Sequence, residues 1–209
     1  MRLFLLRHGQ TQANLANRFS GRHHSPLTKK GVQQMKGVRG WFSENKIQVN
    51  AFYCSPLKRA KQSALIVNEA LHKPLIVDDR LAEIDFGKAE GMTKREIGQM
   101  FPGMLEERSK RRFFFQMEKG ESYALGQKRV IPFLEELKEK RGKDSVAVLA
   151  HECLNRTIIG YFFNLTPEET LAVAFPNNCI LEIDLSKKTS KWVLAGEKKK
   201  GKGWVKEKN

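Results

Sequence analysis

Two histidines in this chain each follow directly on a short apolar segment, near opposite ends of the sequence. His8 follows residues 2–7 and is preceded by Arg7, and His151 follows residues 144–150. A histidine ring nitrogen can be a nucleophile, an acid, a base or a metal ligand. A guanidinium group is a forked donor suited to phosphate oxygens. Taken alone, Arg7 and His8 are explained better as a surface pair after an edge strand than as part of a functional site. The rest of the chain must decide between the two interpretations.

Strand-like and helical segments alternate along the chain, which indicates an α/β sheet. The expected strands are residues 2–7, 49–54, 74–77, 144–150, 179–185 and 191–195, and the main expected helices are 28–44, 55–71, 121–141 and 154–163. Parallel strands end at one common edge of a sheet, where α/β proteins place their ligands. The side chains of Arg7, His8, Arg59 and His151 are therefore expected to converge there. Two arginines and two histidines around one point form an anion pocket that suits phosphate.

Several short motifs occur in an order that identifies a family. They are Leu6-Arg7-His8-Gly9-Gln10-Thr11 with Asn14, Arg18-Phe19-Ser20-Gly21, Pro26-Leu27-Thr28-Lys29-Lys30-Gly31 with Gln34, Ser55-Pro56-Leu57-Lys58-Arg59-Ala60 with Gln62, Leu81-Ala82-Glu83-Ile84-Asp85-Phe86-Gly87 with Glu90-Gly91, Gly120-Glu121-Ser122, and 146–151. From residue 3 to about residue 195 the chain resembles the histidine phosphatase superfamily, also called the phosphoglycerate mutase-like family. The resemblance implies a three-layer α/β/α fold with a mostly parallel central sheet.

The resemblance also implies a role for each matching residue. His8 is expected to attack phosphorus and to become transiently phosphorylated, with Glu83 as general acid for the leaving oxygen. The phosphoryl oxygens are expected to bind Arg7, Arg59 and His151, and the same pocket is expected to include Asn14 and Gly21. Phosphoryl transfer depends mainly on positioning and charge stabilisation, so clustered cations suit it. We expect no metal and no cofactor.

The motif around Glu83 favours a phosphatase over a mutase. Mutases of this family typically continue the motif with an arginine, where this chain has Ile84, and they carry an insertion that is not found here. Arg111 and Arg112 keep the mutase alternative open, because they could grip a substrate carboxylate. A third alternative, an inactive phosphate-binding module, predicts the loss of a catalytic residue. We therefore expect hydrolysis of a small phosphorylated metabolite.

The charge of the pocket bears on the protonation of Glu83. Neighbouring arginines are expected to lower the pKa of His8 and also that of Glu83. A bound phosphate, with roughly −1.5 to −2 charges, would reverse this field. We hypothesise that Glu83 gains its proton mainly once substrate is bound.

Some residues have more than one interpretation. Glu152 stands where the family usually has glycine, and it could narrow specificity, bind a leaving group or point away. The family usually has an aspartate near the position of His24. This histidine could contact substrate, although a place in a solvated loop fits better. Residues 113–115, three phenylalanines in a row, could form a lid over the pocket or pack a helix on the sheet.

Length and composition suit one domain of 209 residues with a net charge of +15. We expect a catalytic domain at 1–196 with a lid and specificity segment at about 88–120, and a basic, poorly ordered tail at 197–209. The chain has three widely spaced cysteines and no apolar run of membrane-spanning length. These features predict a cytoplasmic protein with a small phosphate ester as partner and no membrane contact. The basic tail alone does not predict nucleic-acid binding, and a homodimer stays open.

Overall fold

A seven-stranded sheet forms the centre of the molecule in a computed structural model that describes residues 1–197 and 199–206. Its strand order is β3-β2-β4-β1-β5-β6-β7. The strands are β1 (Arg2–Arg7), β2 (Ala51–Cys54), β3 (Leu75–Val77), β4 (Ser145–Ala150), β5 (Cys179–Asp184), β6 (Thr189–Leu194) and β7 (Lys199–Lys202). Strands β1 to β4 are mutually parallel where they pair, and β5 to β7 continue the sheet in antiparallel pairs. The expected α/β architecture is confirmed.

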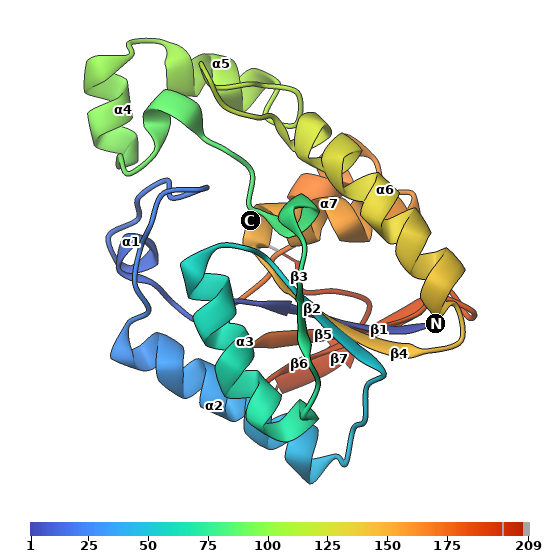
Figure 1. The fold of residues 1–209 in the computed structure, drawn as a ribbon. Coiled ribbons are helices and arrows are strands. Elements are labelled where there is room, and N and C mark those ends of the chain that lie inside the picture. The colour runs from blue at the N-terminus through green and yellow to red at the C-terminus, as the bar shows by residue number, and fades with distance from the viewer. Residues whose placement is uncertain (198, 207–209) are drawn as a thin grey trace.

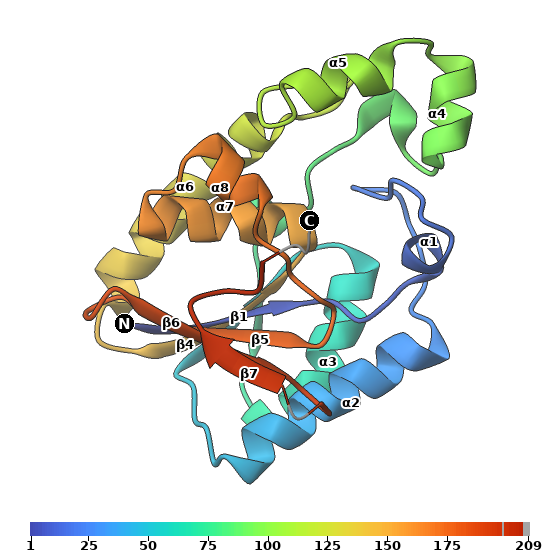
Figure 2. The ribbon, with the colours of Figure 1, turned by 180° about the vertical axis from the view of Figure 1, so that it is seen from behind.

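Helices cover both faces of the sheet (Figures 1 and 2). One face carries α2 (Lys29–Glu44) and α3 (Lys58–Leu71), and the other carries α6 (Tyr123–Arg141) and α7 (Glu152–Phe163). Thr28 and Ser122 begin α2 and α6 as N-caps, because each side chain accepts a backbone N–H from the first turn. The remaining helical elements are α1 (Gln12–Leu15), η1 (Asp79–Leu81), η2 (Gly87–Ala89), α4 (Lys94–Met100), α5 (Met104–Lys110) and α8 (Pro167–Leu171).

Strand β1 shows why the central strands are almost entirely apolar. Successive side chains of a strand point to opposite faces. Leu3 and Leu5 therefore join the core under α6 and α7, while Phe4 and Leu6 join the core under α2 and α3. All four are buried, as a strand covered on both faces requires.

Helices α4 and α5 stand away from the sheet and overhang one end of it (Figure 1). They have a small core of their own, in which Ala89, Ile97 and Met117 are buried and Phe19 and Phe86 pack against them. Arg18 ties this unit to the N-terminal loop, because it donates to the Gly91 carbonyl at 2.7 Å. We call residues 88–120 the lid segment.

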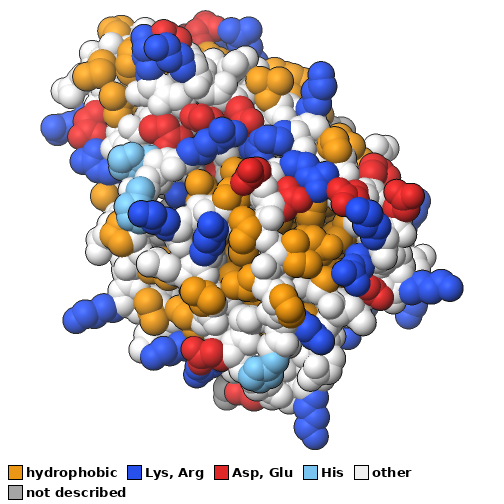
Figure 3. Space-filling model, in the orientation of Figure 1, with side chains coloured by type: hydrophobic (Ala, Val, Ile, Leu, Met, Phe, Trp, Pro, Cys, Tyr) orange, Lys and Arg blue, Asp and Glu red, His pale blue; other side chains and the backbone are white. Residues whose placement is uncertain are grey.

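Within the expected tail, residues 199–206 are ordered, whereas residues 198 and 207–209 lie outside the described part of the chain. Lys199–Lys202 pairs with β6, and Trp204 packs on Phe163 with 5.2 Å between ring centroids. This part of the tail is ordered because Trp204 and Val205 bury apolar surface against the main core, while the β7 lysines stay at the sheet edge. Figure 3 shows that Lys and Arg on the visible face are interspersed with Asp and Glu.

Among the described residues no helix is both long and apolar enough to cross a membrane.

Candidate active site

The two-residue period of β1 directs Arg7 and His8 to opposite sides of the sheet edge. Arg7 continues the face that packs on α7, and it contacts Glu152 there. His8 continues the face that packs on α3, and it contacts Arg59. The neighbouring strand β4 ends at the same register position, with Ala150 opposite Arg7, and the His151 ring that follows lies 5.1 Å from the His8 ring, measured between centroids. The strand ends thus bring together the four side chains expected from the sequence.

The hydrogen bonds of His8 define which ring nitrogen is free to react. Nδ1 lies 2.8 Å from the Gly9 carbonyl oxygen, so Nδ1 carries the hydrogen and donates it. Nε2 then has the lone pair, and it accepts from the Nε–H of Arg59 at 3.2 Å. Burial, Arg59 and Arg7 hold the pKa of His8 well below its ordinary value of 6.5. The ring is therefore neutral at pH 7, with Nε2 as a nucleophilic atom.

Arg59 is held by backbone carbonyls as well as by His8. Its Nη1 donates to the carbonyl of His23 at 3.0 Å, and its Nη2 donates to the carbonyl of Gly21. Gly21 is thus a positioning residue in the pocket wall. A Cβ there would lie 2.2 Å from the Ile84 carbonyl oxygen, so this position has no room for a side chain.

Glu152 is a carboxylate that faces the site and bridges two arginines. Its Oε2 pairs with Arg7 Nη1 at 2.8 Å, and its Oε1 pairs with Arg156 Nη2 at 2.8 Å. Arg7 also donates to the Phe175 carbonyl at 2.7 Å. Of the interpretations open for Glu152, the one in which it points away is wrong.

Glu83 is buried against the N-terminus of α7. Its carboxylate accepts three backbone N–H groups, from Ile84 at 2.9 Å, Cys153 at 3.1 Å and Leu154 at 3.0 Å. The N-cap of α7, His151, makes no side-chain cap bond, so Glu83 supplies that cap from another part of the chain.

Burial raises the pKa of Glu83 from its ordinary value of 4.5, and the three N–H donors and Arg59 oppose this rise. Arg59 lowers the pKa of Glu83, as expected, but the loss of solvation on burial outweighs it, so the net shift is upward. The direction of this shift favours the protonated form of Glu83 relative to a solvent-exposed glutamate.

The structure places the remaining expected residues as follows. Asn14 and Gly21 line the cavity, whereas His151 lies fully buried behind it. His151 Nε2 is 2.7 Å from Ser55 Oγ, and its Nδ1 has no partner among the described residues. Burial, Arg59 and His8 lower the pKa of His151 well below its ordinary value.

Gly9 is constrained by its packing against α2. A Cβ on Gly9 would lie 2.3 Å from the Gly31 carbonyl oxygen. Gly9 and Gly31 are therefore small because the first loop and α2 pack backbone against backbone.

Arg7, His8, Arg59 and Glu83 line a cavity of about 420 Å³, which the lid segment overhangs. Among the residues that the structure describes, its wall includes seven cationic side chains and two carboxylates, Glu83 and Glu152. The cations are Arg7, Arg18, Arg59, Lys94, Arg108, Arg112 and Arg156. Arg108, Lys94 and Arg156 were not singled out from the sequence. The spacing of Arg156 four residues after Glu152 on one helix was a usable signal, whereas Arg108 lies on a short polar helix without one.

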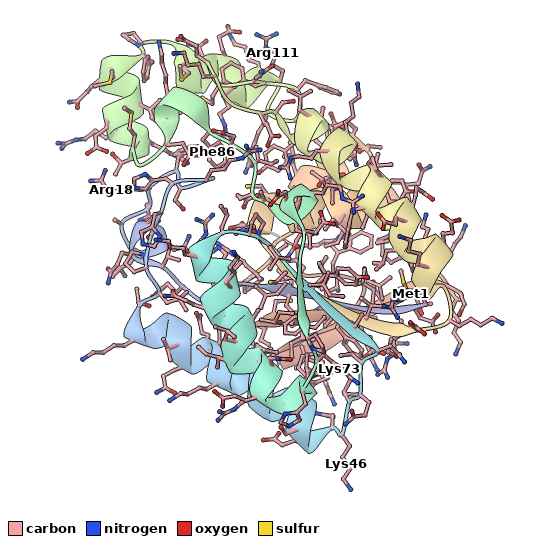
Figure 4. The ribbon with its side chains drawn as sticks, viewed as in Figure 1. Met1, Arg18, Lys46, Lys73, Phe86 and Arg111 are labelled. Atoms are coloured by element: carbon pink, nitrogen blue, oxygen red, sulfur yellow. The ribbon has the colours of Figure 1, made fainter. Side chains whose placement is uncertain are left out.

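Neighbouring residues of the lid segment differ in whether they face the cavity, the interior or the solvent. Arg112 lines the cavity but Arg111 does not, and Figure 4 shows Arg111 at the outer side of the lid, away from Arg18 and Phe86. Phe113 is buried beside Tyr123, whereas Phe114 is 62% exposed.

His24 is exposed and lies outside this cavity. Among the described residues no group of three or more His, Cys, Asp or Glu could hold a metal ion.

The chain belongs to the histidine phosphatase superfamily (branch 1), whose family model matches residues 3–198. A phosphoserine phosphatase 1 from Hydrogenobacter thermophilus is 31% identical over 151 residues, which is 72% of this chain and 71% of that protein. A 6-phosphofructo-2-kinase/fructose-2,6-bisphosphatase from Aquarana catesbeiana is 31% identical over 181 residues, 87% of this chain and 37% of that protein. The chain thus spans little more than a third of such bifunctional relatives.

Solved structures of phosphatases share the fold. The alpha-ribazole phosphatase from Shigella flexneri has a TM-score of 0.83 at 24% identity, covering 94% of this chain and 96% of that chain. A mycobacterial glucosyl-3-phosphoglycerate phosphatase has a TM-score of 0.78 at 24% identity, covering 92% and 96%. The predicted family and fold are confirmed.

Proposed function

We propose that this protein is a phosphomonoesterase that hydrolyses a small phosphorylated metabolite through a phosphohistidine on His8. The observation that carries the proposal is the state of His8. Its pKa is lowered, its Nδ1–H is held by the Gly9 carbonyl, and its Nε2 lone pair lies at a cavity lined by Arg7 and Arg59. Family membership supports phosphoryl chemistry at this site.

In the first step, Nε2 of His8 attacks phosphorus and the bond from phosphorus to the ester oxygen breaks. Arg59 exchanges its bond to Nε2 for a bond to a phosphoryl oxygen, and Arg7 provides a second guanidinium group. The protonated carboxyl of Glu83 donates its proton to the leaving oxygen, so an alcohol departs. The Gly9 carbonyl stabilises the Nδ1–H of the ring while the ring carries the phosphoryl group.

In the second step, water attacks the phosphohistidine. The Glu83 carboxylate, which lost its proton in the first step, takes a proton from this water. The bond from nitrogen to phosphorus breaks, inorganic phosphate leaves, and both His8 and Glu83 return to their starting states. Splitting one displacement into two lowers the barrier of each.

The test is hydrolysis of p-nitrophenyl phosphate in the presence of a chelator, combined with trapping of a radiolabelled phosphoenzyme. We expect an acid-labile, alkali-stable label on the wild type and no label on His8→Ala. The matched control is His24→Ala, which removes an exposed histidine outside the cavity and should keep both label and turnover. Label on His8→Ala, or wild-type turnover that is lost with the chelator, would contradict the proposal. Interconversion of phosphoglycerates without phosphate release would indicate a mutase instead.

A further inference from the structure

Arg108 and Arg112 are two cations of the cavity that the proposed phosphoryl chemistry does not use. Both come from the lid segment, and both are half-buried. Neither forms an ion pair with a carboxylate within the part of the chain that the structure describes. Arg108 lies over the Phe19 ring at 5.3 Å and Arg112 over the Tyr123 ring at 5.8 Å, so each guanidinium group is held by an aromatic surface and not by an acid.

The surroundings of this pair are unfavourable for a positive charge in the free protein. Burial and the charge of Arg112 lower the pKa of Arg108. The Nε of Arg112 is buried and has no hydrogen-bond acceptor among the described residues, and its Nη2 reaches only the Tyr123 hydroxyl, at 3.5 Å. A buried donor without an acceptor is destabilising, because it loses its hydrogen bonds to water and gains none in the protein. Two such cations in one cavity are stabilised if a bound ligand brings an anionic group.

The charge of one phosphoryl group does not account for them. Arg7 and Arg59 already face the phosphoryl position beside His8, and Glu152 neutralises part of the charge around Arg7 and Arg156. The cations of the lid segment thus remain as an excess of positive charge in the cavity. Lys94 adds to this excess, because its side chain lines the same cavity.

We propose that Arg108 and Arg112 form a second anion site, so that the substrate is a phosphomonoester carrying a further carboxylate or phosphate group. This inference rests on the proposed function and specifies its substrate class. Guanidinium groups bind both anions as forked donors. The lid segment then selects the substrate by its additional charge. Arg7 and His8 act on the phosphoryl group that all such substrates share.

The test compares esters that differ by one anionic group. One pair is 3-phosphoglycerate and glycerol 3-phosphate, and the other is glucose 1,6-bisphosphate and glucose 1-phosphate. We expect wild-type kcat/KM to favour the ester with the additional anionic group in at least one pair by about 10- to 100-fold. This is the effect of one or two charge-assisted hydrogen bonds. The carboxylate and phosphate pairs tell the two anions apart.

Variants assign this preference to the lid. Arg108→Gln and Arg112→Gln should each lower the preference by about tenfold or more, mainly through KM. Arg111→Gln is the matched control, because Arg111 is next in sequence but outside the cavity, and it should keep the preference of the wild type. Thermal melts should show that all three variants fold.

Binding measurements separate this inference from the proposed function. Calorimetric titration of His8→Ala with the same ester pairs gives the charge preference without turnover. Equal binding and equal kcat/KM within each pair would overturn the second anion site while leaving the phosphatase proposal intact. If Arg112→Gln abolishes a binding preference but the wild type hydrolyses none of these esters, the second anion site is supported and the phosphatase proposal is overturned. A preference that neither arginine variant changes would also overturn the site.

Discussion

Replacing Glu83 by glutamine should separate the two steps of hydrolysis. The amide cannot donate the carboxyl proton, so esters with an alkyl leaving group should lose the contribution of general acid catalysis, about 10²- to 10⁴-fold in the first step. A p-nitrophenyl ester departs as a stable anion and needs no proton. Its first step should slow by less than about tenfold. The second step loses its base for both esters, because both form the same phosphohistidine.

The structure also sets the cost of this replacement in stability. The Glu83 carboxylate accepts three backbone N–H groups. The glutamine oxygen can keep the two that Oε1 accepts, from Ile84 and Leu154. Its amide NH2 then faces the Cys153 N–H, donor against donor, and the lost bond costs about 1–3 kcal/mol. We therefore expect a folded protein with a lower melting temperature.

The assay is rapid mixing with release of the leaving group followed over one turnover. With p-nitrophenyl phosphate, Glu83→Gln should give a burst of nitrophenolate that is equal to the enzyme concentration, followed by slow turnover. An alkyl ester should give no burst. Equal losses in the first step for both esters would refute Glu83 as the general acid, and turnover without a burst would refute its role as base in the second step.

Three further predictions follow from the site and from the packing beside it. For alkyl esters kcat/KM should have a bell-shaped pH dependence, because it falls as pH drops through the lowered pKa of His8 and falls as pH rises through the raised pKa of Glu83; an alkaline limb that Glu83→Gln leaves unchanged would contradict this. Glu152→Gln should tighten inhibition by inorganic phosphate about fivefold, since a carboxylate no longer competes for the arginine beside it, and weaker inhibition would show that the carboxylate positions that arginine. Gly31→Ala places a Cβ 2.1 Å from a backbone oxygen and should lower the free energy of unfolding by about 1–3 kcal/mol. Its control in the same helix, Gly40→Ala, meets only a flexible side chain at 3.7 Å and should raise it by about 0.5–1 kcal/mol in urea denaturation.

The strand ends were predictable because their signal is local. Residues 2–7 and 144–150 read as buried strands, and each ends at a histidine. Parallel pairing of these strands then brings His8 and His151 together without any further information. The sheet and the phosphate end of the cavity follow from such patterns.

Contacts between distant segments were not predictable in the same way. Glu83 caps a helix that begins about seventy residues later, and no periodicity in the chain links the two. Its pKa therefore depends on burial that only the folded chain defines. Arg108 lies on α5, a short and highly polar helix whose orientation is set by the small lid core. Residues 199–206 were not predictable from composition, because lysines dominate it whereas the ring of Trp204 packs on Phe163.

The place of β1 in the sheet has a consequence for synthesis of the chain. Of the seven strands of this sheet β1 is translated first, but its two neighbours in the sheet are β4 and β5, at residues 145–150 and 179–184. When residue 120 has been translated, the lid segment and the helices α2 and α3 of one face have been made, but neither partner strand of the apolar β1 has. Such an edge invites aggregation. Newly made chains should need a chaperone until β4 and β5 emerge, and His8 has no partner histidine before that time.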